Sequence, residues 1–383
     1  MLDRARVAQK ISHITPLLFT ERTSLAWINK KFWQRLVEQP AFIAYVQTLS
    51  VEKQLISWMG ALGQIVAHEP VVPSYTVYAV DGSQIYPDHH LEGVACCLVH
   101  AAGCRLHYGV SSSATFFSEP HVYVPALLEA QQLPFAADTV DMLREAHEFD
   151  LLARTACQGA QKDYTDPVVA LFDGNLLFWH LEEKSALIRK MFLERYCASL
   201  QLLYEQRIPI AGYLSAPRFR DLAYLVQVGM TAEGVADWME PAQRQVLEQK
   251  LASLTDVELL THVLDAGEYT AIFQSNSALT EYYPTHLRPC FLYLHSGSEV
   301  VRVEIPWWVA QDPDLVKRVV TICCDQSRKG NGYPVALAES HAQAVVKSAD
   351  RDFFYNYIGH VAITQRQRVF LSQKSLKKRV LGV

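Results

Sequence analysis

The feature that most constrains the fold is an alternation of helix-like and strand-like segments in the middle of the chain. Residues 138–158 carry apolar side chains at helical spacing, and a short apolar strand, residues 168–172, follows them. A long helix-like segment, residues 177–206, leads into a second strand-like run, residues 208–214, and a short helix follows Pro217. Such a β-α-β-α order predicts parallel strands covered by helices, which is an α/β fold.

A β-rich segment precedes this alternation. The β-branched and aromatic run 75–80 ends at Asp81-Gly82-Ser83, and two further strand-like runs, residues 93–101 and 104–110, lie on either side of Gly103. A glycine between two such runs is typical of a hairpin, so the first three strands are predicted to form an antiparallel meander. Together with the parallel strands, they predict a mixed sheet flanked by helices.

Helical segments are expected on either side of this core. Residues 1–70 are predicted to be an N-terminal helical region, whose clearest helix has Ser50 as its N-cap. Residues 71–383 are assigned to a second domain, in which residues 232–285 form a mostly polar helical insertion. After the insertion the sequence predicts two strands, residues 290–295 and 299–305, and a helical region that begins near Trp307 and resumes at Pro334.

Composition excludes several classes of protein. The 383 residues are 50% hydrophobic and 20% charged, which is the balance of a globular protein. No apolar stretch approaches the roughly 20 residues of a membrane-spanning helix, and the N-terminal residues lack the apolar segment of a secretory signal. The eight cysteines lie in apolar runs without C-x-x-C spacing, so we expect reduced cysteines and a cytoplasmic location.

The charge of the chain is distributed unevenly. A formal net charge of −5 argues against a protein that coats nucleic acid by bulk electrostatics. Residues 366–383, in contrast, form a basic C-terminal tail without an acidic residue. This tail either contacts phosphates or is a solvated terminal segment, and the sequence alone does not separate the two. Its basic residues are Arg366, Arg368, Lys374, Lys377, Lys378 and Arg379.

Several common catalytic motifs are missing from the sequence. It contains no G-x-x-x-x-G-K-[ST], no G-x-G-x-x-G after a strand, no H-E-x-x-H, no G-x-S-x-G and no zinc-type cysteine pairing. A nucleotide motor, a Rossmann dehydrogenase, a zincin and an α/β-hydrolase therefore lose support. The remaining candidates for chemistry are carboxylates at the ends of strands.

Four side chains could form one site. Asp81 and Asp173 each follow an apolar strand and precede glycine, which is a turn signal taken singly but places both at one sheet edge if the strands are parallel neighbours. Glu148 lies on the intervening helix, one turn after Arg144, where a surface ion pair is the alternative interpretation. With His341, these oxygen donors suit Mg²⁺ or, because of the imidazole, Mn²⁺. Such clusters usually serve phosphodiester hydrolysis.

Four segments, in chain order, resemble the NurA family of DNA-repair nucleases. The resemblance runs from about residue 75 to 350 and implies an RNase H-like core with a metal site. It also implies a 5′-to-3′ exonuclease with single-strand endonuclease activity, usually Mn²⁺-dependent, that acts in DNA end resection. Members typically form homodimers that dock on a hexameric HerA-type ATPase. The segments are residues 80–87 (VDGSQIYP), 171–176 (LFDGNL), 211–217 (AGYLSAP), and 291–293 with 301–310 (FLY and VRVEIPWWVA).

The resemblance also implies roles for individual residues. Asp81, Glu148 and Asp173 are similar to the family's metal-binding carboxylates, and Tyr333 and His341 to its C-terminal tyrosine and histidine. This sequence departs from the family pattern in two respects. Asn175 stands where many relatives carry serine, and Glu145 competes with Glu148 as the helix carboxylate. The loop residues Asp88, His89 and His90 are further possible ligands, but we interpret the two histidines as substrate-facing.

These residues support a hypothesis for the mechanism and two rival interpretations. The three carboxylates would hold one or two divalent ions, with His341 as a ligand or proton carrier. Tyr333 would orient the phosphate, stack on a base or pack in the core, while Arg218 and Arg220 would contact the DNA backbone. One rival is a non-catalytic subunit that binds DNA ends or a partner on the same fold. The other is a nuclease that acts on RNA or small phosphoesters, since recognition of a 2′-hydroxyl depends on geometry.

Overall fold

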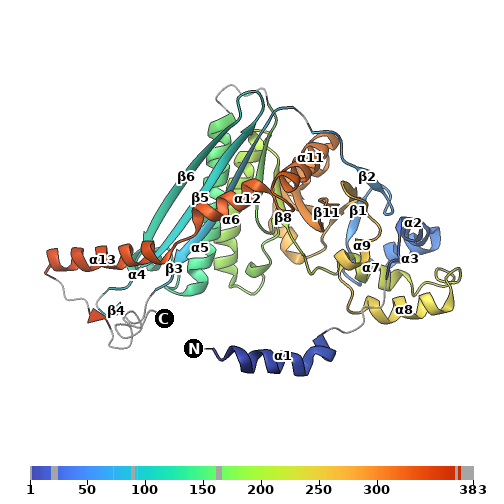
Figure 1. Cartoon of the computed structure of the whole chain (residues 1–383). Helices are drawn as coiled ribbons and strands as arrows, with labels where there is room; N and C mark the ends of the chain where they lie inside the picture. The colour runs from blue at the N-terminus through green and yellow to red at the C-terminus, as the bar shows by residue number, and fades with distance from the viewer. Residues whose placement is uncertain are drawn as a thin grey trace.

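The fold is built around one mixed β-sheet, seen in a computed structural model that describes residues 2–18, 25–71, 73–87, 91–92, 94–160, 166–366 and 370–371. Within these ranges the sheet has the order β1-β10-β11-β12-β8-β7-β3-β5-β6, and β9 joins it by pairing with β11 and β2 (Figure 1). Its strands are β1 (Ser57–Met59), β2 (Ile65–Ala67), β3 (Tyr75–Ile85), β5 (Cys97–Tyr108), β6 (Ser113–Tyr123), β7 (Val168–Phe172), β8 (Ile210–Leu214), β9 (Glu268–Thr270), β10 (Ile272–Gln274), β11 (Pro289–His295) and β12 (Val300–Pro306). A separate short pair consists of β4 (Leu91–Glu92) and β13 (Phe370–Leu371).

The strands β6-β5-β3-β7-β8 form the core of this sheet. β5 runs antiparallel to both β3 and β6, whereas β7 is parallel to β3 and β8 is parallel to β7. Numbered along the chain, these five strands have the spatial order 3-2-1-4-5, with the second strand reversed. This is the arrangement expected of an RNase H-like core, and it confirms the mixed sheet flanked by helices that the sequence predicts.

Helices cover both faces of the core sheet. α5 and α6 pack against each other on one face, and α11 and α12 lie on the other, where α12 crosses β3 and β5 (Figure 1). None of the described helices has both the length and the apolar character that crossing a membrane requires. The longer helices are α1 (Arg4–Leu18), α2 (Lys30–Val37), α3 (Pro40–Leu49), α5 (Ala137–Ala160), α6 (Ala186–Glu205), α7 (Asp221–Gly229), α8 (Pro241–Leu251), α11 (Pro313–Lys329), α12 (Val335–Ala344) and α13 (Ser348–Thr364). Shorter helical segments are α4 (Pro125–Glu129), η1 (Trp179–Leu181), α9 (Asp256–Leu260), η2 (Ala278–Tyr282), η3 (Thr285–Leu287) and α10 (Trp307–Ala310).

The first strands of the core differ from those predicted. β3 continues through Asp81 to Ile85, and Cys97–Tyr108 is one strand rather than two, with the third strand at Ser113–Tyr123. Gly103, taken as a hairpin glycine, lies inside β5. A Cβ there would lie 2.2 Å from the carbonyl oxygen of Ala79 on β3, so the glycine permits a close approach of two strands rather than a turn. The antiparallel meander itself is correct.

The predicted helix after Ser50 is wrong. Ser50 is the C-cap of α3, and the apolar residues that follow it form the short strands β1 and β2. These strands pair with β10 and β9, so this region belongs to the main sheet and not to a separate helical one. Apolar side chains at three-to-four spacing fit a helix, but pairing with distant strands decided the structure here.

The predicted insertion, residues 232–285, is only partly helical. It contains α8 and α9, but also β9 and β10, which extend the main sheet. With α2, α3 and α7 it builds a second hydrophobic core beside the one under β3, β7 and β8. Of the basic tail, only Arg366 and the backbone of Phe370–Leu371 lie in the described part of the chain.

Candidate active site

Asp81 and Asp173 come together because of the register between β3 and β7. Val80 pairs with Phe172 in this parallel ladder, and each aspartate is the next residue of its strand. β7 ends there, whereas β3 continues, so Asp81 is half-buried and Asp173 is exposed. The two carboxylates predicted to share an edge therefore lie at the end of the β3–β7 pairing.

His341 reaches this point from α12, on one face of β3. Its Nδ1 lies 2.6 Å from Oδ2 of Asp81, while the backbone N–H of Gly82 donates to Oδ1 at 2.7 Å. α12 is fixed in place at both ends. The hydroxyl of Ser83 donates to the carbonyl of Ala344, and Oε1 of Gln326 accepts from the backbone N–H of Ala336 at 3.1 Å.

Glu148 approaches β3 from α5, on the opposite face. Successive strand residues point to opposite faces, so Gly82 faces α5 where Asp81 faces α12. A Cβ at Gly82 would lie 2.2 Å from Oε1 of Glu148 and 2.7 Å from Cγ of Arg144, so glycine is required for the carboxyl to lie here. Glu145, the competing candidate, instead accepts from the Tyr196 hydroxyl at 2.7 Å. The structure thus places Glu148, and not Glu145, against the strand of Asp81.

The environment of Glu148 favours its protonated form. Burial raises the pKa of Glu148 to about 8, and the negative charges of Asp81 and Glu145 add to the shift. The guanidinium of Arg144, 2.5 Å from Oε1, opposes it. A divalent cation beside this carboxyl would favour its ionised form and lower its pKa.

Tyr333 joins the site from the turn that precedes α12. Its hydroxyl donates a hydrogen bond to Asp173, and its ring packs edge-on against Tyr213 at 5.8 Å between centroids. Asp173 keeps contact with solvent, but the protein atoms packed around its carboxyl desolvate it in part and raise its pKa. Asp81 contributes in the same direction, and the bond from Tyr333 opposes the shift. The phenol is therefore both a packed core residue and a donor to the second aspartate.

The donors match the chemistry of a hard divalent cation, but they do not yet enclose one. Within the described ranges, no three Asp, Glu, His or Cys side chains stand close enough together to hold a metal ion. The carboxylates lie on both sides of β3, near the end of the β3–β7 pairing, and do not converge on one position. Two residues after Asp173 in the chain, Oδ1 of Asn175 is buried without a hydrogen-bond partner and is a further candidate oxygen donor. Three carboxylates and an amide oxygen suit Mg²⁺ or Mn²⁺.

The two predicted DNA contacts differ in their surroundings. Both follow β8, whose C-terminal end lies on the same sheet edge as Asp173. Arg218 is exposed. Arg220 donates to the carbonyls of Leu251 at 2.8 Å and Leu254 at 3.2 Å, so its guanidinium holds the end of α8. The loop of Asp88, His89 and His90 lies outside the described residues.

Two charged residues that the sequence analysis gave no role lie buried on β12. Glu304 accepts from the backbone N–H groups of Leu176 and Leu177, just after Asp173, and Arg302 pairs with it at 2.9 Å. The signal was present in the sequence VVRVEI. Opposite charges two residues apart share one face of a strand, and on an otherwise apolar strand they indicate a buried ion pair.

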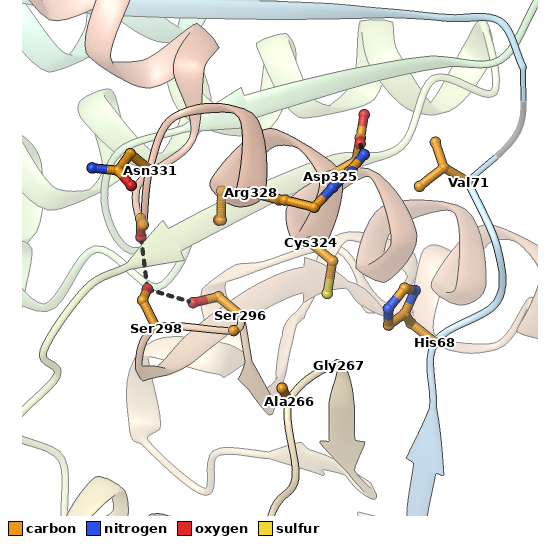
Figure 2. Close-up of a pocket in the computed structure, with 13 residues that line it drawn as sticks. His68, Val71, Ala266, Gly267, Ser296, Ser298, Cys324, Asp325, Arg328 and Asn331 are labelled. Atoms are coloured by element: carbon orange, nitrogen blue, oxygen red, sulfur yellow. Dashed lines mark hydrogen bonds and ion pairs between the residues drawn. The ribbon is translucent and has the colours of Figure 1, made fainter.

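A pocket of about 400 Å³ lies away from this site (Figure 2). It is bounded by the β11–β12 turn and the end of α11, and none of the predicted site residues lines it. Its buried carboxylate, Asp325, already accepts from the Tyr75 hydroxyl at 2.5 Å and from Arg328. The lining includes His68, Ser296, Ser298, Asp325, Arg328 and Asn331.

Comparisons with known proteins point to one family. The family model for the NurA domain matches residues 75–346, and no curated protein matches the chain significantly. The chain is similar to the NurA nuclease from Sulfolobus solfataricus, with 16% identity and a TM-score of 0.47 over 88% of this chain and 98% of that one. It is also similar to a NurA with manganese (12% identity, TM-score 0.38, 92% and 98% covered) and to a NurA bound to dAMP and manganese (11%, 0.33, 86% and 95%).

Proposed function

Because this chain belongs to the NurA family, we propose that it is a divalent-metal-dependent DNA nuclease. The observation that carries the proposal is the register of β3 and β7, which brings Asp81 and Asp173 together between Glu148 on one face and His341 on the other. This arrangement is a set of oxygen donors with one imidazole, which is the kind of donor set that can hold the divalent ions used in phosphodiester hydrolysis. Solved relatives with manganese favour Mn²⁺ as the cofactor, with Mg²⁺ as the alternative.

Each residue of the site has a distinct part in this proposal. Asp81, Glu148 and Asp173 would hold the cation, and a bound cation would supply activation of water and neutralisation of charge on the scissile phosphate. Tyr333 keeps Asp173 oriented through the single hydrogen bond that its hydroxyl donates. His341 is exposed and close to Asp81, so it is placed to carry a proton or to complete the ligand set.

The proposed substrate is DNA at its ends. A 5′-to-3′ exonuclease with single-strand endonuclease activity in end resection is what membership of the family suggests. The net charge of −5 requires a local basic path for the strand rather than a uniformly basic surface. Arg218, exposed beyond β8 at the edge of the site, is the described residue best placed to begin it.

The proposal extends to two protein partners, a second copy of the chain and a HerA-type hexameric ATPase. Helix α13 supports the homodimer, because it extends away from the body (Figure 1) and exposes large apolar side chains. Phe353 is 69% exposed, Tyr357 59% and Ile363 76%. Light scattering of the wild type and of Phe353→Ser/Tyr357→Ser tests the dimer. A wild type that is monomeric at all concentrations rejects it, and co-purification with the ATPase tests the complex.

The nuclease itself is tested with labelled oligonucleotides. Single- and double-stranded DNA, labelled at the 5′ or 3′ end, is incubated with protein and Mn²⁺, Mg²⁺ or EDTA, beside Asp81→Ala and Asp173→Ala. Asp150→Ala is the matched control, because Asp150 lies on α5 but pairs with Arg154 at the surface. We expect metal-dependent digestion that both site variants lose and the control keeps.

Other outcomes separate the rival functions. No digestion with any metal, even with the ATPase present, would reject the nuclease and leave a non-catalytic subunit that binds DNA ends or a partner. Preferential digestion of an RNA of the same sequence would reject DNA as the substrate.

A further inference from the structure

The central strand β12 buries two opposite charges. Arg302 and Glu304 are each only 1% exposed, and Nε of the arginine lies 2.9 Å from Oε1 of the glutamate. Removing an ion pair from water costs about as much as the pairing returns, so such a pair is weak evidence for stability. The other contacts of these two side chains therefore indicate what the pair does.

The second oxygen of Glu304 holds the segment that follows Asp173. Oε2 accepts from the backbone N–H of Leu176 at 2.7 Å and of Leu177 at 3.2 Å. These amides follow Asp173 by only three and four residues, and among the described strands the pairing with β7 ends at Phe172. Hydrogen bonds to a charged acceptor are about twice as strong as neutral ones, so the carboxylate is an effective anchor for this segment.

The segment reaches Glu304 by crossing β8 at Gly212. Gly212 is paired with Glu304 across the β8–β12 ladder, and a Cβ on it would lie 2.4 Å from the carbonyl oxygen of Gly174. The backbone after Asp173 therefore lies directly on β8, which only glycine permits. Past this crossing, the backbone N–H groups of Leu176 and Leu177 donate to the carboxylate of Glu304.

Arg302 connects the same carboxylate to the loop after β8. Its Nη1 lies 2.7 Å from Oδ2 of Asp221, the first residue of α7. Its guanidinium is also stacked between two rings, 4.0 Å from the centroid of Phe219 and 3.5 Å from that of Phe291. The Arg302–Glu304 pair thus links the loop that follows β7 to the loop that follows β8, and both loops lie at the edge of the site.

We infer that Arg302 and Glu304 are positioning residues, which hold the segment of Asp173 so that its carboxylate faces Asp81. This inference rests on the proposed function, because it concerns the same cation site. A displacement of reacting groups by about 1 Å can lower an enzymatic rate by about 10²-fold. Anchoring on β12 prevents such a displacement at an aspartate that stands at the start of a loop.

The test removes the charge of the anchor without changing its shape. Glu304→Gln keeps the volume of the side chain but removes one of the two carboxylates that balance the buried Arg302, so that only Asp221 remains. Arg302→Met/Glu304→Gln removes the guanidinium as well. Asp221 then loses its partner but is partly exposed, so no fully buried charge of this network is left underbalanced in the double variant. Glu268→Gln is the matched control, because Glu268 also accepts a backbone N–H, from Asp265 at 2.8 Å, and pairs with Lys30 at 2.7 Å.

Two readouts separate positioning from stability. In metal-free protein we expect the amides of Leu176 and Leu177 to exchange about tenfold faster in both Glu304 variants. With DNA, we expect the Mn²⁺ concentration for half-maximal digestion to rise about tenfold. In the double variant, thermal stability recovers relative to Glu304→Gln, but the exchange rate and the Mn²⁺ requirement do not. The Glu268→Gln control shows neither effect.

Each contrary outcome has a definite meaning. An active wild type whose Glu304 variants keep normal exchange and a normal Mn²⁺ requirement rejects the positioning role alone. Recovery of the Mn²⁺ requirement together with stability in the double variant rejects it too, because the role would then be purely structural. A wild type without digestion under any metal would overturn the proposed function and, with it, this inference.

Discussion

Nδ1 of His341 lies 2.6 Å from Oδ2 of Asp81, and this contact joins α12 to β3, the middle strand of the five-stranded core. The histidine side chain is 68% exposed, whereas the aspartate is 18% exposed. The pair therefore faces solvent on the histidine side, where a substrate phosphate can approach. The sequence predicts the two residues independently, Asp81 as a strand-end carboxylate and His341 as a helical histidine.

His341→Ala should impair the site without destabilising the fold. The imidazole end of the contact with Asp81 is exposed, and contacts of this kind contribute about 0–1 kcal/mol, so we expect the free energy of unfolding to fall by no more than about 1 kcal/mol. If His341 completes the ligand set or carries a proton, digestion should slow by about 10²-fold. Urea unfolding and digestion at several Mn²⁺ concentrations measure the two effects. Normal digestion at every Mn²⁺ concentration would remove His341 from the site.

Gly82→Ala should disturb the position of Glu148. The new Cβ would lie 2.2 Å from Oε1 of Glu148 and 2.7 Å from Cγ of Arg144, so α5 or its side chains must shift. Overpacking of this kind costs about 1–3 kcal/mol of unfolding free energy, and we expect the activity to fall as well. Chemical denaturation and digestion assays measure both quantities.

Gly359→Ala provides the control for this change. Gly359 lies in α13, and a Cβ on it would meet no atom within 4 Å. Alanine is the better helix former, so this variant should be as stable as the wild type or more stable by about 1 kcal/mol. Equal stability losses in the two glycine variants would contradict the steric account of Gly82.

The parts of the site predicted correctly are those that local pattern determines. The apolar run that ends at Asp173 and the long helix with Glu148 were identified from periodicity, and parallel pairing follows from the β-α-β order. The choice between Glu145 and Glu148 needed the structure. Both carboxyls lie on one helix, and the absence of a side chain at Gly82 decides which of them reaches β3.

The parts predicted incorrectly depend on distant contacts. Gly103 resembles a hairpin glycine in the sequence, but Ala79 on the neighbouring strand explains it. The segment after Ser50 has helical spacing, yet it forms strands because β9 and β10, more than 200 residues away, provide partners. Neither fact is encoded locally, since strand pairing is a property of two segments.

Arg218→Ala and Arg220→Ala should act on different properties. Arg218 is exposed at the edge of the site, so its loss should weaken DNA binding similarly for all sequences and lower the salt dependence by about one phosphate contact. Arg220 donates to the carbonyls of Leu251 and Leu254, so its loss should cost about 1–2 kcal/mol of stability. Fluorescence anisotropy at several salt concentrations and thermal unfolding separate the two. Weaker DNA binding by Arg220→Ala at unchanged stability would contradict this assignment.

The stability of the metal-free protein should fall as the pH rises, because of Glu148. Burial raises the pKa of Glu148 from 4.5 to about 8, so the folded protein keeps this proton over a range in which the unfolded chain has released it. The folded state then binds more protons than the unfolded state, and the free energy of unfolding decreases between about pH 4.5 and about pH 8. Glu148→Gln has no such proton. The stability of the wild type relative to this variant, measured by urea unfolding in EDTA, should therefore drop across this window by about 1–4 kcal/mol and level off above it.

In Mn²⁺ titrations, the same proton of Glu148 should be released when the carboxylate binds the ion, so the affinity for Mn²⁺ should increase with pH up to about 8. A stability difference that does not change with pH would show that Glu148 is already ionised in the folded protein and that Arg144 alone balances its charge.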